Sequence, residues 1–455
     1  VFLAVAGQEH LPHEVSIDVP AGTEGWRVVT SLPRQGAAPL GFGSYHAETY
    51  DALIDHPVEI GCHETDGFMI DGIPHALAFY GETYPHGQNL KEDMKTAVME
   101  VARTMGEIPF THYQFITHFA PKLYGGLEHL NSTALQFDGR RLAVRKDYLA
   151  FLSLTAHEYF HAWNVKRIRP RALGPFDYRN EGYTTLLWLA EGLTSLMDDL
   201  FIYRAGLSTL EEYAEVIKGN LEGYYGTPGK KFHSLEASSF NAWIKLYRPD
   251  ENSKNSSISY YLKGGLVFMA LHAHLLQKGK KIDDLLKLLW ADYKRRPETG
   301  VEKEDVYSMV RELGGVEVFN EFFRMVETTE DINFEVILKS FGMELVWNDG
   351  APVWLGAEFD FVGDRAVVRT VLLDSPAAKA GLNAGDEIIS INDLRVFKDD
   401  VEKWGQVMRA ETTYHFMVAR LGRLTKLEVR FEKGPRTIKE VKVIDKVLAE
   451  KSFKR

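Results

Sequence analysis

The chain has 455 residues, enough for about three domains, and its 45% hydrophobic and 26% charged residues exclude disordered, collagen-like and coiled-coil classes. With 53 Lys and Arg against 64 Asp and Glu, the formal net charge is −11, so we expect no broad basic surface for nucleic acid or anionic lipid. The single cysteine, Cys62, excludes an internal disulfide and a metal site made of several thiolates, so any metal must be held by His, Asp or Glu.

Periodicity along the chain predicts a multidomain α+β protein. Alternating apolar and polar residues with Pro and Gly turns indicate a β-rich domain over residues 1–82, followed by a mainly helical domain over 83–335. Alternation returns in a small β-rich domain over 336–435, and residues 436–455 form a C-terminal tail of strand, helix or frayed chain.

Within the helical domain, an amphipathic helix is predicted from Leu90, followed by two extended segments, 115–119 and 127–135. Further helices are predicted over 147–165, 184–205, 210–224, 264–277, 282–293, 306–313 and 317–326. No apolar run approaches the roughly 20 residues that span a bilayer, so a soluble protein of cytoplasm or periplasm is expected. The first residue is Val1, from which we expect a processed or truncated N-terminal domain, and the compartment stays open.

The strongest motif is His157-Glu158-Tyr159-Phe160-His161, which lies inside a predicted helix. Four residues advance a helix by about 400°, so His157 and His161 share one face and can bind one metal ion. Glu158 points aside from that pair, where it can accept a proton from a zinc-bound water whose pKa is lowered to about 7. The motif therefore predicts a hydrolytic zinc centre.

A catalytic zinc site needs a third protein ligand and one open position. The candidate is Glu191, a carboxylate within the apolar helical sequence Trp188-Leu189-Ala190-Glu191-Gly192-Leu193-Thr194. An unpaired charge buried in such a helix is costly, so Glu191 needs a partner. It could instead be half of a buried ion pair. We predict Zn²⁺, one ion per chain, although a His2Glu set also accepts cobalt or manganese.

These residues resemble the gluzincin metallopeptidases, and among them the glycyl aminopeptidase family, relatives of aminopeptidase N that carry a C-terminal PDZ domain. The resemblance covers nearly the whole chain and is carried by the extended string from His157 through Asn164-Val165-Lys166-Arg167 to Pro170 and by the Trp-x-x-Glu-Gly-x-Thr segment around Glu191. It implies a thermolysin-like catalytic domain over 83–335. The basic run after the zinc helix, Lys166, Arg167 and Arg169, is assigned to a solvated or ion-paired helix end.

Gly125-Gly126-Leu127-Glu128-His129 resembles the Gly-x-Met-Glu-Asn motif of aminopeptidase N. The resemblance implies that Gly125, Gly126 and Glu128 bind substrate, with Glu128 holding the free amine. A carboxylate beside the metal selects peptides whose ammonium group ends there. His129 stands where aminopeptidase N has Asn.

Tyr260-Tyr261-Leu262-Lys263-Gly264 resembles the aminopeptidase N segment that supplies a tyrosine to the tetrahedral intermediate. The resemblance implies that Tyr261 donates a hydrogen bond to the developing oxyanion, which would stabilise charge present only in the transition state. Tyr260 is then its structural neighbour.

The segment from Ser375-Pro376-Ala377 through Ala380-Gly381-Leu382 and Gly385-Asp386 to Asn392 resembles the core of bacterial PDZ domains. The carboxylate-binding loop is then Trp354-Leu355-Gly356-Ala357, with Leu355 and Gly356 at the centre of the site for a peptide C-terminus. This domain could equally serve as a scaffold packed on the peptidase.

Three functions follow from these motifs. The leading one is a zinc aminopeptidase for peptides with a free N-terminus, with the preference for Gly or Ala that the resemblance implies. The alternatives are a thermolysin-type endopeptidase, in which Glu128 has no essential role, and a non-catalytic PDZ peptide-binding or chaperone-like protein. Intact candidate ligands and base argue against the last.

Overall fold

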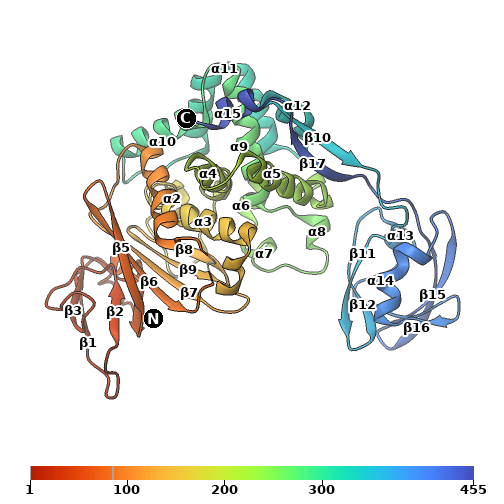
Figure 1. Cartoon of the computed structure of the whole chain (residues 1–455), viewed down its shortest axis with the longest axis horizontal. Coiled ribbons are helices and arrows are strands. Elements are labelled where there is room, and N and C mark those ends of the chain that lie inside the picture. Colours follow the sequence, from red (N-terminus) through yellow and green to blue (C-terminus); the bar gives the residue numbers. More distant parts are fainter. Residues whose placement is uncertain (1, 85–86) are drawn as a thin grey trace. The chain divides into compact units, whose positions relative to one another are not determined.

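The computed structural model describes residues 2–84 and 87–455. These form two compact units (Figure 1). Unit 1 comprises residues 1–213, 274–319 and 451–455, and unit 2 comprises 214–273 and 320–450. The candidate metal ligands all lie in unit 1.

Unit 1 begins with two small antiparallel sheets, as the alternation in the sequence predicts. Strand β1 (His13–Ile17) pairs with β3 (Gly43–Ala47), and β2 (Arg27–Thr30) pairs with β4 (Val58–Gly61). The short helix α1 (Tyr50–Ile54) begins at Thr49, whose side chain accepts a hydrogen bond from Ala52 N. Buried apolar side chains join these elements: Val28, Leu32, Tyr45, Ala47, Tyr50 and Leu53.

A five-stranded mixed sheet follows, in the order β5-β6-β7-β9-β8. Its strands are β5 (Glu64–Ile70), β6 (Ile73–Gly81), β7 (Tyr113–Phe119), β8 (Tyr124–Glu128) and β9 (Ser132–Phe137). The sequence predicted one extended segment over 127–135, and this is wrong: the chain turns at 129–131, and β8 runs antiparallel to β9. The turn places β8, with Glu128 as its last residue, at the edge of the sheet.

Helices cover this sheet (Figure 1). Helix α2 (Leu90–Met105) contacts β5, and α3 (Arg145–Phe160) contacts β8 and β9. Behind α3 lies α4 (Leu193–Arg204), which continues from the π-helix η3 (Trp188–Gly192). The chain adds α10 (Ile282–Arg295) and α11 (Lys303–Glu327), and Gly315 with φ +78° divides α11 into the two helices that the sequence predicted.

Unit 2 contains a helical part and the C-terminal β domain. Its helices include most of α5 (Leu210–Tyr225) and α9 (Tyr260–Leu276), with the shorter α6 (Leu235–Phe240), α7 (Ala242–Lys245), α8 (Ser253–Ser256) and α12 (Phe334–Ser340). The sequence analysis predicted α5 and α9, but not the short helices, because four to seven residues are too few to establish a helical period.

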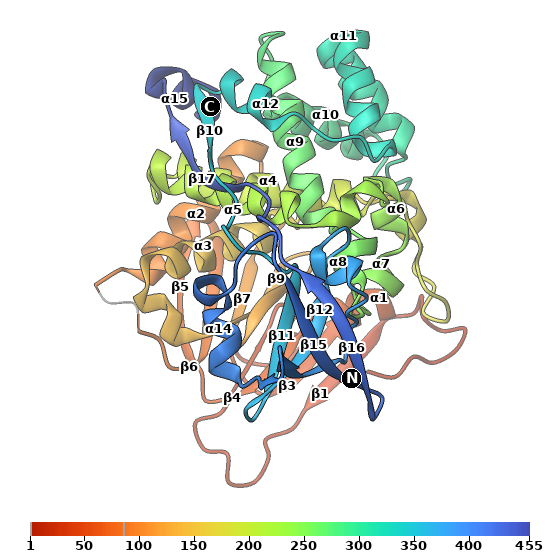
Figure 2. The same ribbon diagram turned by 90° about the vertical axis from the view of Figure 1, so that its right-hand side faces the viewer.

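The C-terminal domain is a sheet in the order β11-β12-β13-β15-β16, with β14 paired to β13 (Figure 2). Its strands are β11 (Ala357–Val362), β12 (Arg365–Val371), β13 (Glu387–Ile391), β14 (Leu394–Arg395), β15 (Thr413–Arg420) and β16 (Arg423–Arg430). The helices α13 (Pro376–Lys379) and α14 (Lys398–Val407) complete it. Its core contains Val368, Ile388, Trp404, Phe416 and Val418.

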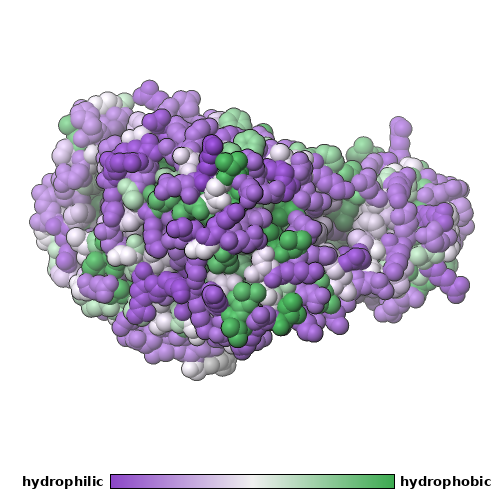
Figure 3. Space-filling model, turned by 90° about the horizontal axis from the view of Figure 1, so that it is seen from above, coloured by the Kyte–Doolittle hydropathy of each residue, from purple (hydrophilic) through white to green (hydrophobic). Residues whose placement is uncertain are grey.

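The tail is ordered. Strand β17 (Thr437–Val443) pairs antiparallel with β10 (Met343–Asn348), and α15 (Lys446–Phe453) follows. Among the described residues, no helix combines the length and apolar character needed to cross a membrane. The face seen in Figure 3 is mainly hydrophilic, with scattered small apolar groups, in keeping with the charged composition.

Candidate active site

The three candidate metal ligands lie together in unit 1. His157 and His161 are at the C-terminal end of α3, and Glu191 is in η3. Oε2 of Glu191 lies 3.3 Å from Nε2 of His157 and 3.2 Å from Nε2 of His161. One ligand atom from each residue lies within 4.8 Å of the others. Two imidazoles and one carboxylate at this separation suit a divalent cation, and zinc in particular.

Hydrogen bonds at the other ring nitrogens orient both imidazoles. Nδ1 of His157 lies 2.8 Å from Oδ2 of Asp198, and Nδ1 of His161 lies 2.5 Å from the carbonyl oxygen of Asn164. Both Nε2 atoms are thereby left for Glu191 and a metal. The neighbouring carboxylate of Asp199 accepts a hydrogen bond from Ser153 Oγ at 2.7 Å.

The π-helix that carries Glu191 is held by Asn164. The wider turn of a π-helix disturbs the regular hydrogen-bond ladder. The fully buried Asn164 amide donates to the carbonyl oxygens of Leu189 and Ala190, at 3.0 and 3.1 Å. Asn164 thus contacts His161 through its backbone and the Glu191 segment through its side chain. The sequence analysis gives Asn164 no role. The signal that could have found it is a polar residue three positions after the second histidine.

Glu158 is nearly fully buried beside this cluster, at 4% exposure, and its Oε2 has no hydrogen-bond partner among the described residues. Burial raises the pKa of Glu158 to about 7. A carboxylate with that pKa can both accept and return a proton near neutral pH.

The two glycines of β8 are required for different reasons, and Gly126 makes room for Glu158. A Cβ atom at Gly126 would lie 2.2 Å from Glu158 Oε1 and 2.4 Å from its Cγ, so a larger residue would displace the carboxylate. Gly125 has φ +146°, which non-glycine residues rarely adopt. The Gly-Gly pair is therefore required by backbone conformation and by close approach to the candidate base.

Glu128 is half-buried and faces the same cluster. Its carboxylate, that of Glu158 and a nitrogen of His161 lie within 4.8 Å of one another. This second group shares His161 with the first but offers only one imidazole, so the His157, His161 and Glu191 set matches catalytic zinc better. The role of Glu128 stays a prediction.

The electrostatics of the cluster also favour a bound cation. Burial opposes protonation of His157, but hydrogen bonds with Asp198 and Glu191 outweigh it and raise the pKa of the imidazole well above its ordinary value. Burial likewise opposes protonation of His161, and the charge of Glu191 leads the interactions that raise its pKa to about 9. A metal ion would supply the positive charge in place of these protons, so the residues fit a divalent metal.

The remaining candidate residues lie in unit 2. Tyr261 is on the first turn of α9 and half-buried, while Tyr260 is 1% exposed, stacks on Tyr261 and has its hydroxyl 3.3 Å from that of Tyr247. In the C-terminal domain, Leu355 is buried and Gly356 has φ +75°, just before the edge strand β11. The roles of Tyr261, Leu355 and Gly356 stay predictions.

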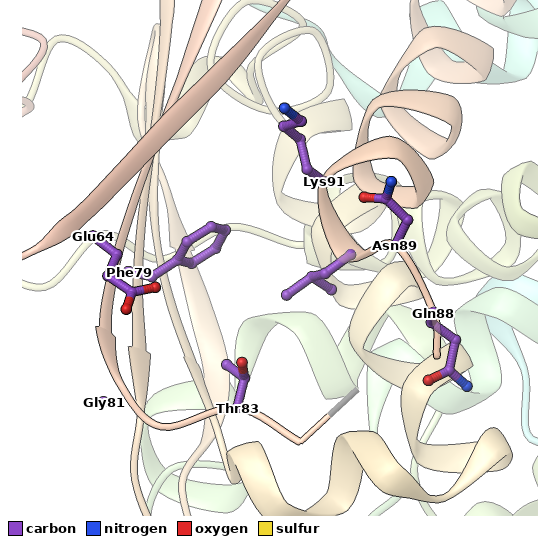
Figure 4. A pocket seen from close by; sticks show the side chains of 8 residues that line it. Glu64, Phe79, Gly81, Thr83, Gln88, Asn89 and Lys91 are labelled. Atoms are coloured by element: carbon purple, nitrogen blue, oxygen red, sulfur yellow. The ribbon is translucent and has the colours of Figure 1, made fainter. Parts of the chain in front are cut away.

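Of two pockets in unit 1, one is lined by a candidate site residue and the other is not. One, of about 240 Å³, lies beside Glu128 and is also lined by Asp55, Lys166, Phe176 and Tyr178. The other, of about 410 Å³, lies where β6 ends and α2 begins (Figure 4). Its lining includes none of the candidate site residues, whereas the lining of the first pocket includes Glu128.

Three parts of the chain match models of known protein families. The family model of M61 glycyl aminopeptidases matches residues 150–267, the model of the peptidase M61 N-terminal domain matches 1–62, and a PDZ domain model matches 367–415. The order of these matches confirms the predicted fold class, with a β-rich N-terminal domain, a mainly helical peptidase domain and a PDZ domain.

Among solved structures, an aminopeptidase N family protein from Idiomarina loihiensis is 29% identical, with a TM-score of 0.91, over 99% of this chain and 81% of that one. An M1 zinc metallopeptidase from Deinococcus radiodurans is 13% identical, with a TM-score of 0.44, over 71% of this chain and 64% of that one. The second similarity is too low to support a shared function.

Proposed function

The chain belongs to the M61 glycyl aminopeptidase family, as the sequence resemblance predicted, and on that premise we propose that it is a zinc-dependent aminopeptidase that removes small N-terminal residues from peptides. The observation that carries the proposal is the convergence of His157, His161 and Glu191 beside the buried carboxylate of Glu158. The preference for Gly or Ala rests on the family resemblance.

His157, His161 and Glu191 would hold one zinc ion per chain. Zinc bound there supplies Lewis-acid polarisation of the scissile carbonyl and of the attacking water. Asp198 keeps His157 in the tautomer whose Nε2 is free to ligate, and Asn164 does the same for His161. Cobalt or manganese could also occupy a set of this kind.

Glu158 acts as general base. It accepts a proton from the attacking water and transfers it to the nitrogen of the leaving peptide, so its carboxylate is regenerated in each cycle. The family resemblance assigns to Tyr261 a hydrogen bond to the oxyanion that forms as the carbonyl carbon becomes tetrahedral.

Glu128 gives the enzyme its preference for a free N-terminus. Its carboxylate accepts hydrogen bonds from the substrate ammonium group at the end of an edge strand, in a charge-assisted contact. An N-blocked peptide lacks the positive charge and meets the carboxylate with a bulky acyl group.

The C-terminal domain binds the C-terminus of a peptide, with Leu355 and Gly356 at the carboxylate loop. The supporting observation is that β11 is an edge strand of its sheet, so an added peptide strand could pair with it. Titration with peptides that end in a free or an amidated carboxyl group tests this binding, which must need the free carboxylate.

The decisive experiment compares hydrolysis of free and N-acetylated glycyl and alanyl peptides by zinc-loaded protein. We expect cleavage of only the free-amine peptides, abolished in Glu158→Gln and weakened in Glu128→Gln. Glu64→Gln, an exposed carboxylate of β5, is the matched control and should retain wild-type rates.

Each other outcome points to a different function. Cleavage of the acetylated peptides at similar rates would indicate an endopeptidase. Absence of cleavage with one zinc ion bound per chain would favour a peptide-binding protein.

A further inference from the structure

The carboxylate of Asp55, the residue that follows α1, binds three groups from two other parts of unit 1. Its Oδ1 accepts hydrogen bonds from Lys166 Nζ at 2.6 Å and from His129 Nδ1 at 3.3 Å. Its Oδ2 accepts from the backbone N–H of Leu130 at 2.8 Å. Asp55 therefore connects the turn after β8 with the segment after α3.

The turn after β8 is held from both sides. While Asp55 binds the N–H of Leu130, the carbonyl oxygen of Leu130 accepts a hydrogen bond from Arg167 Nη1 at 3.0 Å. Arg167 also donates to the carbonyl oxygens of Ala162 and Pro109, at 2.6 and 3.0 Å. Both backbone groups of a residue two positions after Glu128 are thus bound by charged side chains.

The other end of the link is close to the metal ligands. Lys166 follows His161 by five residues, and its backbone N–H donates to the carbonyl oxygen of His161 at 2.9 Å. A chain of contacts therefore runs from Glu128 through His129 and Leu130 to Asp55 and Lys166, and on to His161. Lys166 and Arg167, which the sequence analysis assigned to a solvated or ion-paired helix end, are therefore part of this connection.

The link is protected from solvent. The side chains of Asp55 and Lys166 are 13% and 18% exposed. Burial works against the charge of Asp55, yet the hydrogen bonds from His129 and Lys166, with the lysine charge, hold the pKa of the carboxyl below its ordinary value. A low-exposure pair of this kind is geometrically restrained, unlike a solvated surface ion pair.

Strand β8 depends on such restraint because it has only one neighbour, β9, within its sheet. Its last residue, Glu128, must lie at a set distance from the metal ligands if the ammonium group and the scissile carbonyl of one substrate residue are to be held together. A misplacement of about 1 Å can reduce the rate by about 100-fold.

We propose that Asp55 is a positioning residue for amine recognition: it fixes the turn after β8 against the segment after α3 and so sets the position of Glu128 relative to the metal centre. This inference rests on the proposed function, in which Glu128 binds the substrate ammonium group. Asp55 acts on Glu128 through the turn, by its hydrogen bonds to His129 and Leu130.

The test uses two zinc-binding probes that differ by one amine, glycine hydroxamate and acetohydroxamate, and measures their inhibition constants on the full-length, zinc-loaded protein. In Asp55→Asn, we expect glycine hydroxamate to bind about 10-fold more weakly and acetohydroxamate to change less than about 2-fold. Asp66→Asn is the matched control, because Asp66 also pairs with a lysine, Lys91, and accepts a backbone N–H bond, but is half exposed. It should change neither constant.

The outcomes separate this inference from the proposed function. If wild-type protein binds the two hydroxamates equally, amine recognition by Glu128 is wrong and the role of Asp55 falls with it. If the wild type prefers glycine hydroxamate and Asp55→Asn keeps that preference, only the role of Asp55 is overturned. Equal weakening of both probes would show general damage to the centre and would also overturn it.

A second variant covers the case in which Asp55→Asn does not fold. Lys166→Met breaks the same link from the α3 side but leaves the bond between Asp55 and Leu130. This variant should weaken the binding of glycine hydroxamate severalfold and leave the inhibition constant of acetohydroxamate unchanged. An unchanged ratio of the two inhibition constants would overturn the inference.

Discussion

Replacing Gly126 with alanine tests whether the candidate base needs the space that this glycine leaves. The added Cβ would lie 2.2 to 2.4 Å from three atoms of the Glu158 side chain, whereas Cβ contacts below 3.0 Å essentially never occur. One partner must therefore move by about 1 Å. The atoms in conflict belong to a side chain, so the fold should survive while the carboxylate is displaced.

A displacement of this size at a proton-transfer group is expected to reduce kcat/KM for a free-amine peptide by about 100-fold. The assay measures kcat and KM on glycyl and alanyl peptides, with zinc content and thermal unfolding recorded on the same samples. Zinc should stay at the wild-type level, because the three atoms nearest to the added Cβ all belong to Glu158 and none to a candidate metal ligand.

The matched control is Gly219→Ala in α5, where a new Cβ meets nothing within 4 Å. It should retain wild-type activity. A Gly126→Ala protein with kcat/KM within about 3-fold of wild type would refute the reasoning, since Glu158 would then not need its observed position. Loss of zinc or of folding would show that the glycine acts through structure and not through the base.

Three further predictions concern charge. In metal-free protein, the pKa of Glu158 is raised from 4.5 to about 7, so folding favours its protonated form and stability falls as pH rises through that window. Relative to wild type, the free energy of unfolding of Glu158→Gln should therefore rise by up to about 3 kcal/mol between pH 4.5 and pH 8, measured by urea unfolding. A difference in unfolding free energy that does not depend on pH would contradict the burial argument. Asp198→Asn should weaken zinc binding by about 10- to 100-fold in a chelator competition, whereas Asp199→Asn, whose carboxylate accepts a hydrogen bond from Ser153 and not from a histidine, should change zinc binding far less. Because the pKa of His161 is raised to about 9, zinc must displace protons, and its apparent affinity should fall continuously as pH is lowered from 9 to 6; an affinity independent of pH would be inconsistent with this.

The sequence by itself determined those parts of the site that depend on local geometry. A spacing of four residues places His157 and His161 on one helix face wherever the helix packs, and an apolar helix that contains a carboxylate singles out Glu191. The domain order and the long helices also follow from periodicity, since an amphipathic pattern of three or more turns is hard to form by chance.

The tertiary structure decided the contacts between residues far apart in the chain. Gly126 and Glu158 are 32 positions apart, and nothing in the local pattern shows that one needs the other to be small. The contact of Asp55 with Lys166 joins residues 111 positions apart, and a single carboxylate after a short helix has no distinguishing local signal. Such pairs are set by how strands and helices pack, because hydrophobic burial brings the elements together without regard to distance along the chain. Local propensity therefore predicts the helix that carries the two candidate histidine ligands, whereas only the packed fold reveals what holds Glu158 and Glu128 in place.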